Sequence, residues 1–309
     1  MSYESEMLKS LRMPVRSEVE KAILISLFKH NGIIKEFGIG EEIVDEIANY
    51  FGLTDEQRSA YLETIYRKEN RLKKSNLWHR LLFRGADSLA KEELVSRPTE
   101  TLRLTDKREW MLTEKGIDTV LKLLNIPGSK KEFLSTKSYE VQKIVKKLNR
   151  SKRPNVYNPI DKEKKTRKKL IESKMRKRGF RIAVIEAYNY KCALCGMKIN
   201  SPDNLQWEVE AAHIVPHRLY GKDDIWNGLA LCHLHHWAFD VGWFTLLDNY
   251  SVQISSKIDF LPHGLGKFGE SDFLRSFVKT ESKIFLPEEI ETYPHKNSLN
   301  WHRENIFHQ

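Results

Sequence analysis

With 309 residues, of which 40% are apolar and 30% charged, the chain has the length and composition of two ordinary globular domains, which excludes a disordered protein. Lys and Arg outnumber Asp and Glu by 52 to 42, and this excess of positive charge favours a polyanionic partner such as nucleic acid. No apolar run reaches the roughly 20 residues of a membrane-spanning helix, the N-terminal sequence lacks a signal peptide, and the three cysteines do not suggest a secreted disulfide framework. We therefore expect a cytoplasmic protein without a membrane partner.

Residues 1–127 are expected to form a mostly helical first domain. Apolar side chains recur there at the spacing of amphipathic helices, and Thr54 followed by Gln57 has the pattern of a capping box. The predicted helices cover residues 18–29, 40–51, a stretch that begins at Thr54, 72–83 and 112–124. Residues 101–112 alternate loosely and are rich in Thr and Leu, which predicts a short hairpin.

Helices followed by a hairpin describe a winged helix, a shape that is common among DNA-binding domains. The stretches GIGEEIVDEIANYFGLTDEQRSAYL and LRLTDKREWMLTEKGIDTV, within residues 15–127, resemble the amino-terminal winged-helix domain of Mrr-type restriction proteins. This resemblance implies a domain that reads DNA. The alternative is an unrelated helical domain, because helix-rich domains that bind protein show similar patterns.

A connector is expected over residues 128–161, where SKRPNVYNP has two prolines and little apolar periodicity. The next stretch, residues 162–178, holds ten Lys or Arg against two Glu. Such a run just before a cysteine-bearing site predicts an arm that contacts DNA phosphates, although a merely solvated helix face is the alternative. The candidate DNA-contacting residues are Lys168, Lys169, Arg176, Lys177, Arg178 and Arg181.

All three cysteines of the chain fall into one metal-binding pattern. Cys192 and Cys195 are separated by two residues, and a second pair with the same gap, Cys232 and His235, follows after 36 intervening residues. Two residues in one turn can reach the same ion, so two such pairs supply three thiolates and one imidazole, a set that suits tetrahedral Zn²⁺. The alternative is a set of buried structural cysteines with an incidental histidine.

The residues between these pairs suggest chemistry beyond a structural zinc. His213 lies in an alternating apolar stretch, as on a strand of a hairpin, and Asn227 precedes an apolar segment that we expect to be helical. His236 directly follows His235. Adjacent side chains on a helix point about 100° apart, so one histidine can serve the zinc while its neighbour faces another site.

The motifs EAAHIVP, NGLALCHLHHWAFDVGWFTL and CALCG resemble the signature of HNH nucleases, as found in modification-dependent restriction enzymes, and the similarity extends from Phe180 to the C-terminal tail. The resemblance implies a β-hairpin and helix around a catalytic divalent ion (Mg²⁺, Mn²⁺ or Ni²⁺), braced by a structural zinc. By motif position, His213 matches the general base, Asn227 the central asparagine, and His236 a ligand of the catalytic metal. The zinc positions match Cys192, Cys195, Cys232 and His235.

One position departs from this pattern. Many members of the family have an acidic metal ligand directly before the first histidine, where this chain has Ala212. Glu210 shares a strand face with Ala212, so it is either a metal ligand or a surface carboxylate. Asp240, four residues after His236, lies on the same helical face and is expected either to orient His236 or to support the ion.

Other aromatic and histidine residues are interpreted as structural or solvated. Four tryptophans are expected to pack the small core: Trp207, Trp226, Trp237 and Trp243. His217 and Arg218 form a loop pair that either lies in solvent or touches phosphate. Three further histidines have no ligand-like spacing: His263, His295 and His302.

The combined prediction is an α+β protein, with a winged-helix-like DNA-reading domain over residues 1–127, a connector over 128–161 and a zinc-braced ββα-metal nuclease domain over 162–309. The predicted activity is metal-dependent hydrolysis of phosphodiester bonds in double-stranded DNA, giving 5′-phosphate and 3′-hydroxyl ends, in the restriction of foreign DNA that could bear modified bases. The alternatives are a homing or repair nuclease, and a non-catalytic zinc protein that binds DNA, which only Ala212 favours. Cleavage of both strands needs two active sites, so a homodimer is a candidate assembly.

Overall fold

The computed structural model describes residues 3–38, 40–66, 71–161, 169–260, 267–268, 271–272 and 282–309. No helix within these ranges is both long and apolar enough to cross a bilayer. The contacts divide the chain into two units, Met1–Gln142 and Lys143–Gln309. The boundary lies within α8 (Tyr139–Asn149), inside the stretch predicted as a connector.

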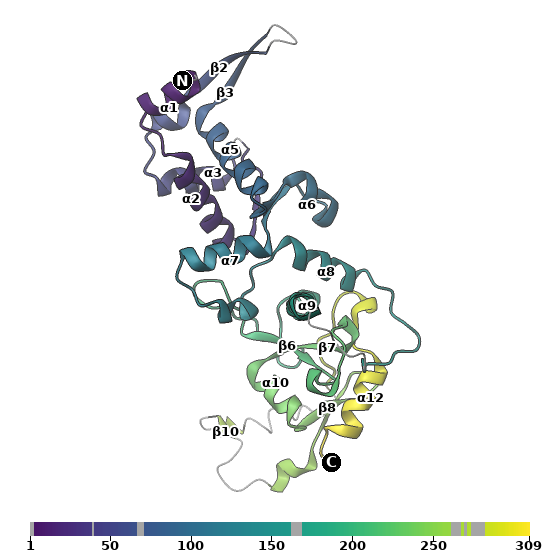
Figure 1. The fold of residues 1–309 in the computed structure, drawn as a ribbon. Helices are drawn as coiled ribbons and strands as arrows, with labels where there is room; N and C mark the ends of the chain where they lie inside the picture. The colour runs from purple at the N-terminus through teal and green to yellow at the C-terminus, as the bar shows by residue number, and fades with distance from the viewer. Residues whose placement is uncertain are drawn as a thin grey trace. The chain divides into compact units, whose positions relative to one another are not determined.

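Unit 1 combines helices with two small antiparallel sheets. Its elements are α1 (Tyr3–Ser10), α2 (Arg16–Lys29), β1 (Ile33–Lys35), α3 (Glu42–Tyr50), α4 (Asp55–Ser59), β2 (Tyr61–Tyr66), β3 (Arg71–Asn76), α5 (Leu77–Lys91), β4 (Val95–Ser96), α6 (Pro98–Thr105), β5 (Glu109–Leu112), α7 (Glu114–Leu123) and η1 (Gly128–Phe133). One sheet has the strand order β1-β5-β4, and β2 pairs with β3 in a hairpin that extends beyond the helices of this unit (Figure 1).

The core of unit 1 forms where α2 packs against α5. Leu27 and Phe28 of α2 and Trp78 and Leu82 of α5 are each at most 1% exposed. Burying a large apolar side chain of this kind contributes about 1.5–3 kcal/mol, so this helix pair supplies much of the stability of the unit.

Side-chain caps set the beginnings of two predicted helices. Thr54 and Gln57 form the expected capping box at the start of α4. The Thr113 hydroxyl accepts a hydrogen bond from the amide of Gly116 at 3.0 Å and begins α7. A Cβ on Gly116 would lie 2.0 Å from the carbonyl oxygen of Leu94, so only glycine allows α7 to lie this close to the chain before β4.

Two predictions for unit 1 were wrong in part. The helix predicted over 72–83 begins only at Leu77, because residues 71–76 pair with β2 and the Asn76 side chain caps α5 by accepting from the His79 amide at 3.0 Å. The predicted hairpin over 101–112 is also wrong: its first half is the end of α6, which has Pro98 in its first turn. The second half, β5, pairs with β1 and β4, which are strands outside the predicted hairpin.

Unit 2 is a mixed helical and stranded domain that is built around the β6–β7 hairpin. Its elements after α8 are α9 (Lys169–Ala187), β6 (Val209–His213), η2 (His217–Leu219), η3 (Ile225–Asn227), β7 (Gly228–Cys232), α10 (His233–Asp240), β8 (Phe244–Leu246), β9 (Val252–Ile254), η4 (Ser256–Phe260), β10 (Lys267–Phe268), β11 (Ser271–Asp272), η5 (Ile290–Thr292) and α12 (Lys296–Asn305). In the hairpin, Val209 pairs with Cys232 and His213 with Gly228.

The hairpin lies close to α9 because Gly228 has no side chain. A Cβ on Gly228 would lie 2.4 Å from Cγ2 of Val184 and 3.1 Å from the ring of Phe180. Both partners are buried in the core of the unit. The close approach brings the C-terminal half of α9 beside His213, the strand partner of Gly228.

Two expectations for unit 2 need correction. The apolar segment after Asn227 was predicted to be helical, but its first five residues are strand β7, and α10 begins at His233. Five consecutive buried residues fit either structure, and pairing with β6 decides for the strand. Trp237 does not pack the core as predicted, since it is 52% exposed on the outer face of α10. His263 lies outside the described residues.

Candidate active site and metal cluster

The four predicted zinc ligands converge in the structure. Cys192 and Cys195 lie in the turn after α9, Cys232 ends β7 and His235 lies in the first turn of α10. Their ligand atoms are all within 4.8 Å of one another, and His235 Nδ1 lies 3.3 Å from Cys192 Sγ and 3.0 Å from Cys232 Sγ. In a tetrahedral site with metal–sulfur bonds of about 2.3 Å, the sulfurs lie roughly 3.8 Å apart. The cluster therefore has a donor set and a spacing that could hold a metal such as zinc.

The electrostatics of this cluster favour a cation. Hydrogen bonds from the Cys195 and Cys232 thiols lower the pKa of Cys192, although its burial acts in the opposite direction. Hydrogen bonds with Cys192 and Cys195, together with burial, raise the pKa of Cys232. Burial lowers the pKa of His235, but the hydrogen bonds and charges of Cys192 and Cys195 outweigh it and raise the pKa to about 9. A divalent ion would satisfy the same demand for positive charge with all three thiols ionised.

His213 is held on the β6 strand by an aromatic ring and a carboxylate. Its imidazole stacks on Phe180 of α9, with 4.1 Å between the ring centroids and 22° between the planes. His213 Nε2 lies 3.0 Å from Asp223 Oδ1, and the Asp223 side chain is only 5% exposed. No described residue hydrogen-bonds to His213 Nδ1, so this nitrogen remains for a substrate proton.

Asn227 closes the loop that carries Asp223. Its side chain is completely buried, its Oδ1 accepts from the Val215 amide at 2.9 Å, and its Nδ2 donates to the carbonyls of Val215 and Lys222 at 3.1 and 3.0 Å. A Cβ on Gly221 would lie 1.8 Å from the Val215 carbonyl oxygen, so this loop is tightly closed. Asn227 thus fixes the chain on both sides of the loop rather than facing the solvent.

His236 lies between two carboxylates. Its Nδ1 is 3.1 Å from Glu210 Oε2 on β6, and its Nε2 is 3.6 Å from Asp240 Oδ2 one turn later on α10. Ala212 is buried and pairs with Leu229, whereas Glu210, two residues earlier, reaches the histidine. The structure thus brings Glu210, His236 and Asp240 together, with the carboxylates at different ring nitrogens.

The protonation states of Glu210, His236 and Asp240 depend on one another. Burial lowers the pKa of His236, but the Glu210 hydrogen bond and the Asp240 and Glu210 charges outweigh it, so the pKa is raised. The hydrogen bond from His236 lowers the pKa of Glu210 against the effect of burial. Burial raises the pKa of Asp240, although the positive charges of His236, Arg218 and His213 oppose this. The anionic Glu210 and the protonated His236 therefore stabilise each other.

The adjacent histidines of α10 face different groups, as the helical offset predicts. His235 turns its Nδ1 to the cysteines, and His236 turns its Nδ1 to Glu210. The sequence reasoning missed two participants. One is Asp223, and the other is His233, whose Nε2 lies 3.3 Å from Glu210 Oε1. The repeated histidines of HLHH were a signal for His233, but no spacing rule pointed to Asp223.

The predicted DNA-contacting residues differ in exposure. Arg176 is exposed, Lys177 is half-buried and Arg178 is only 5% exposed. Arg181 is half-buried, and its charge helps to lower the pKa of Glu210. Lys168 and the side chain of Lys169 lie outside the described part of the chain.

Residues 192–247 match the family that is described as HNH endonuclease. A solved structure of a modification-dependent TagI restriction endonuclease is similar over 41% of this chain and 37% of that chain, with 18% sequence identity and a TM-score of 0.29. The similarity thus spans little more than a third of that protein. No curated protein matches the sequence. The family match places an HNH endonuclease domain on the segment that holds His213, His236 and the cysteine cluster, and it supports a DNA endonuclease.

Proposed function

We propose that this chain is a metal-dependent DNA endonuclease with its active site between β6 and α10. One observation carries the proposal: His213, fixed by Asp223, and His236, flanked by Glu210 and Asp240, lie within one hairpin–helix module. A phosphodiester repels hydroxide, so hydrolysis needs a water that is activated in place and a positive charge on the phosphate oxygens. The module offers a base for the first task and a nitrogen–oxygen donor set for the second.

The cysteine cluster is proposed as a structural zinc site. Cys192, Cys195, Cys232 and His235 fill four tetrahedral positions, which leaves no open position for substrate. Because Cys232 ends β7 and His235 lies in α10, an ion there would brace the hairpin against the helix.

In the proposed reaction, His213 takes a proton from water at Nδ1 while Asp223 accepts the hydrogen of Nε2. Asn227 contributes indirectly, because it holds the loop between His213 and Asp223. A divalent ion (Mg²⁺, Mn²⁺ or Ni²⁺) would supply Lewis-acid stabilisation of the phosphate and the leaving 3′ oxygen. The expected products have 5′-phosphate and 3′-hydroxyl ends.

Glu210 and Asp240 are assigned different tasks. An imidazole that binds an ion through one nitrogen usually donates from the other to a carboxylate, which fixes the ring. The positive charges of His213 and Arg218 act on Asp240, which supports Asp240 as the carboxylate nearer the proposed general base. We therefore assign Asp240 and His236 Nε2 to the ion, and Glu210 to orienting the ring through Nδ1.

The remaining parts of the chain are proposed to bind double-stranded DNA. We propose residues 1–127 as a winged-helix-like DNA-reading domain, 128–161 as a connector and 162–309 as the nuclease domain, with Arg176 and Lys177 of α9 on DNA phosphates. The motif resemblance to restriction enzymes supports a role in restriction, with DNA bearing modified bases as a candidate substrate. Cleavage of both strands would be served by a homodimer.

Substitution of the adjacent histidines tests this proposal. His235→Ala should lose the zinc and lower the melting temperature, because the tetrahedral site loses a corner. His236→Ala should keep the zinc but lose cleavage. His213→Ala should also keep the zinc and lower the cleavage rate about 10²–10⁴-fold.

The measurements are elemental analysis, melting curves and cleavage of plasmid and phage DNAs that differ in base modification, with Mg²⁺, Mn²⁺ or Ni²⁺. Cleavage that survives in both His213→Ala and His236→Ala would overturn the assigned active site. Zinc lost from His236→Ala but kept by His235→Ala would reverse the roles of the two histidines.

A further inference from the structure

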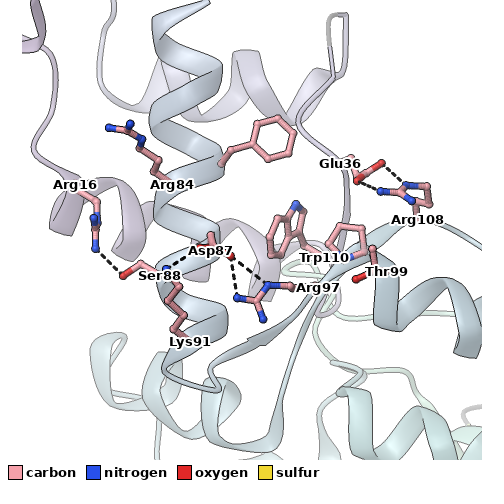
Figure 2. A pocket seen from close by; sticks show the side chains of 12 residues that line it. Arg16, Glu36, Arg84, Asp87, Ser88, Lys91, Arg97, Thr99, Arg108 and Trp110 are labelled. Carbon is pink, nitrogen blue, oxygen red and sulfur yellow. Dashed lines mark hydrogen bonds and ion pairs between the residues drawn. The ribbon is translucent and has the colours of Figure 1, made fainter. Parts of the chain in front are cut away.

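Unit 1 contains a pocket of about 650 Å³ that is separate from the site in unit 2. Figure 2 shows its lining side chains, which come from the start of α2, the chain after β1, the C-terminal half of α5, the start of α6 and the β5 strand. Pockets of 300–1,000 Å³ are typical of sites for small molecules and cofactors. The volume is therefore sufficient for one nucleotide.

An aromatic wall lines one part of the pocket. Trp110 is 4% exposed and stacks on Phe37, with 6.0 Å between the centroids, and Phe37 meets Phe83 edge to face at 5.5 Å. Phe83 is 40% exposed. The partly exposed phenyl ring of Phe83, packed through Phe37 to the buried indole, offers a planar ligand a rigid apolar surface.

The indole of Trp110 has an unused hydrogen-bond donor. No described residue accepts a hydrogen bond from its buried Nε1. By contrast, Trp78, equally buried in the same unit, donates from Nε1 to the Val44 carbonyl at 3.2 Å. A buried donor without a partner destabilises the folded chain, so a ligand acceptor that reached Trp110 Nε1 would gain a hydrogen bond that the protein does not supply.

The pocket is rich in positive charge. Five cationic side chains line it, against two carboxylates. Asp87 lies 2.8 Å from Arg97 and 3.1 Å from Lys91. Arg108 donates to the two carboxylate oxygens of Glu36 from Nε and Nη2. Arg16 pairs with Glu20 and Arg84 pairs with Glu4, and neither glutamate lines the pocket. With these two added to the two lining carboxylates, the five cations outnumber the carboxylates by five to four.

The start of α6 also lines the pocket through Pro98 and Thr99, and its own acidic residue Glu100 already accepts a hydrogen bond from the Arg97 amide at 2.9 Å. Hydrogen bonds from Arg97 and Lys91 lower the pKa of Asp87, so its carboxylate stays ionised and keeps these two cations ordered.

We propose that this pocket binds a single nucleotide, with the base against Phe83 beside Trp110 and the phosphate near Arg97. The fit is threefold: a planar face for stacking, donors and acceptors for a base edge, and cations for a phosphate. The nucleotide is either free or part of a DNA strand with its base turned out of the duplex. The case of a nucleotide within a DNA strand rests on the proposed nuclease function, and the case of a free nucleotide does not.

Two pocket variants and one matched control test the proposal in the full-length protein. Trp110→Phe removes the indole donor but keeps a ring in the core, and Phe83→Ala removes a partly exposed ring. The control, Trp78→Phe, makes the same exchange at a donor that is already satisfied. Trp110→Phe should therefore lower the melting temperature less than Trp78→Phe, which loses an internal hydrogen bond.

Binding is measured by calorimetry with the four deoxynucleoside 5′-monophosphates, and by fluorescence anisotropy with DNA duplexes that differ by one mismatched pair. No divalent metal is added, so that the DNA is not cut. A mismatched base is easier to turn out of the helix. We expect Phe83→Ala to weaken binding about 10-fold or more and Trp110→Phe about 3- to 10-fold, with no change for Trp78→Phe.

Loss of free-nucleotide binding in the pocket variants would support a free ligand. Loss of a preference for mismatched over matched DNA would support an extruded nucleotide. The proposal is overturned if neither ligand distinguishes the pocket variants from Trp78→Phe. Failure of the nuclease proposal is a separate result. It would appear as cleavage that survives in His213→Ala and His236→Ala, and it would leave nucleotide affinity unchanged.

Discussion

Asp223 determines what the ring of His213 can do. A neutral imidazole carries its proton on one nitrogen, and the other nitrogen is then the base. With Asp223 Oδ1 at 3.0 Å from Nε2, the carboxylate selects the form with hydrogen on Nε2 and the lone pair on Nδ1. Phe180 stacks on the ring and limits its rotation. One polar and one apolar contact thus position His213 for its proposed role as the base.

Asp223→Asn is expected to lower the cleavage rate substantially, up to the roughly 10²–10⁴-fold that a positioned general base contributes. An amide can present its NH₂ group to Nε2 and select the other tautomer. The KM for DNA should stay unchanged, since Asp223 touches the histidine and not the phosphate in this scheme. Steady-state cleavage kinetics measure both constants.

The neighbouring Asp224 provides a matched control for this substitution. Its carboxylate accepts a hydrogen bond from the Tyr157 hydroxyl at 3.2 Å, and an asparagine oxygen can accept the same bond. Asp224→Asn should therefore retain most of the rate. Equal losses in the two variants would mean that the turn needs both acids for folding and that Asp223 has no special role.

Individual residues were predictable where a spacing rule applied. The paired gaps of Cys192, Cys195, Cys232 and His235 predicted a cluster that the structure assembles. The i, i+4 relation likewise predicted the contact of His236 with Asp240. Asp223 had no such signal, because its position depends on how the buried Asn227 closes the loop after β6.

Among elements, helices with local signals were predictable and strand pairing was not. The capping box at Thr54 is encoded within four residues, and α4 begins where this box predicts. The Thr113 cap that begins α7 is equally local. Strands β5 and β7 depend on partners far along the chain, so periodicity misassigned the segments that contain them. The exposure of Trp237 is equally non-local, since it depends on what packs over α10.

The C-terminal helix α12 is anchored through a buried histidine. His302 is 1% exposed, stacks on Phe239 of α10 at 3.7 Å and donates from Nε2 to the Phe239 carbonyl at 3.1 Å. Its Nδ1 accepts from the Thr245 hydroxyl of β8 at 2.9 Å. This geometry uses both nitrogens of the neutral ring and ties three elements of unit 2 together.

This anchor should make unit 2 sensitive to acid. Burial lowers the pKa of His302 to about 4, against 6.5 for an unperturbed histidine, with Arg303 adding to the shift. Between these values the unfolded chain takes up a proton that the folded chain does not, so stability falls as the pH falls from 6.5 to 4. At pH 5 the loss amounts to about 2 kcal/mol, at roughly 1.4 kcal/mol per pH unit.

Chemical denaturation at pH 7.5 and pH 5 measures this effect. His302→Gln keeps a donor for the Phe239 carbonyl but cannot titrate. The wild-type chain should lose about 2 kcal/mol more between the two pH values than the variant does. Zinc release in acid affects both proteins, so it cancels in the comparison. Parallel losses in the two proteins would show that His302 does not carry the acid sensitivity.

At the scale of the whole molecule, the sequence predicted two folded parts and a nuclease signature in the second. The contact boundary at residue 142 falls within the predicted connector, and the family match lies inside unit 2. The arrangement of β1, β4 and β5 and the pocket beside them in unit 1 could not be predicted, because both bring together segments that are distant in the sequence. The net charge, by contrast, follows from the sequence alone.

The positive charge of Arg176 and Lys177 predicts how DNA affinity depends on salt concentration. If Arg176 and Lys177 contact phosphates, the double change Arg176→Gln and Lys177→Gln should weaken binding to all DNA sequences alike. Each lost phosphate contact reduces the slope of log affinity against log salt by about 0.9, so a decrease of up to about 2 is expected. Arg178 is left unchanged because it is buried, and its removal would test folding instead.

The control removes the same charge elsewhere in unit 2. Lys257 and Lys296 are both exposed, and Lys257→Gln with Lys296→Gln changes the net charge by the same two units. Long-range attraction depends on net charge, so it should fall equally in both double variants and shift the affinity slightly. Only specific phosphate contacts alter the slope in one variant and not the other. Equal slopes for the two variants, measured by anisotropy between 50 and 200 mM salt, would mean that this part of α9 is only a solvated helix face.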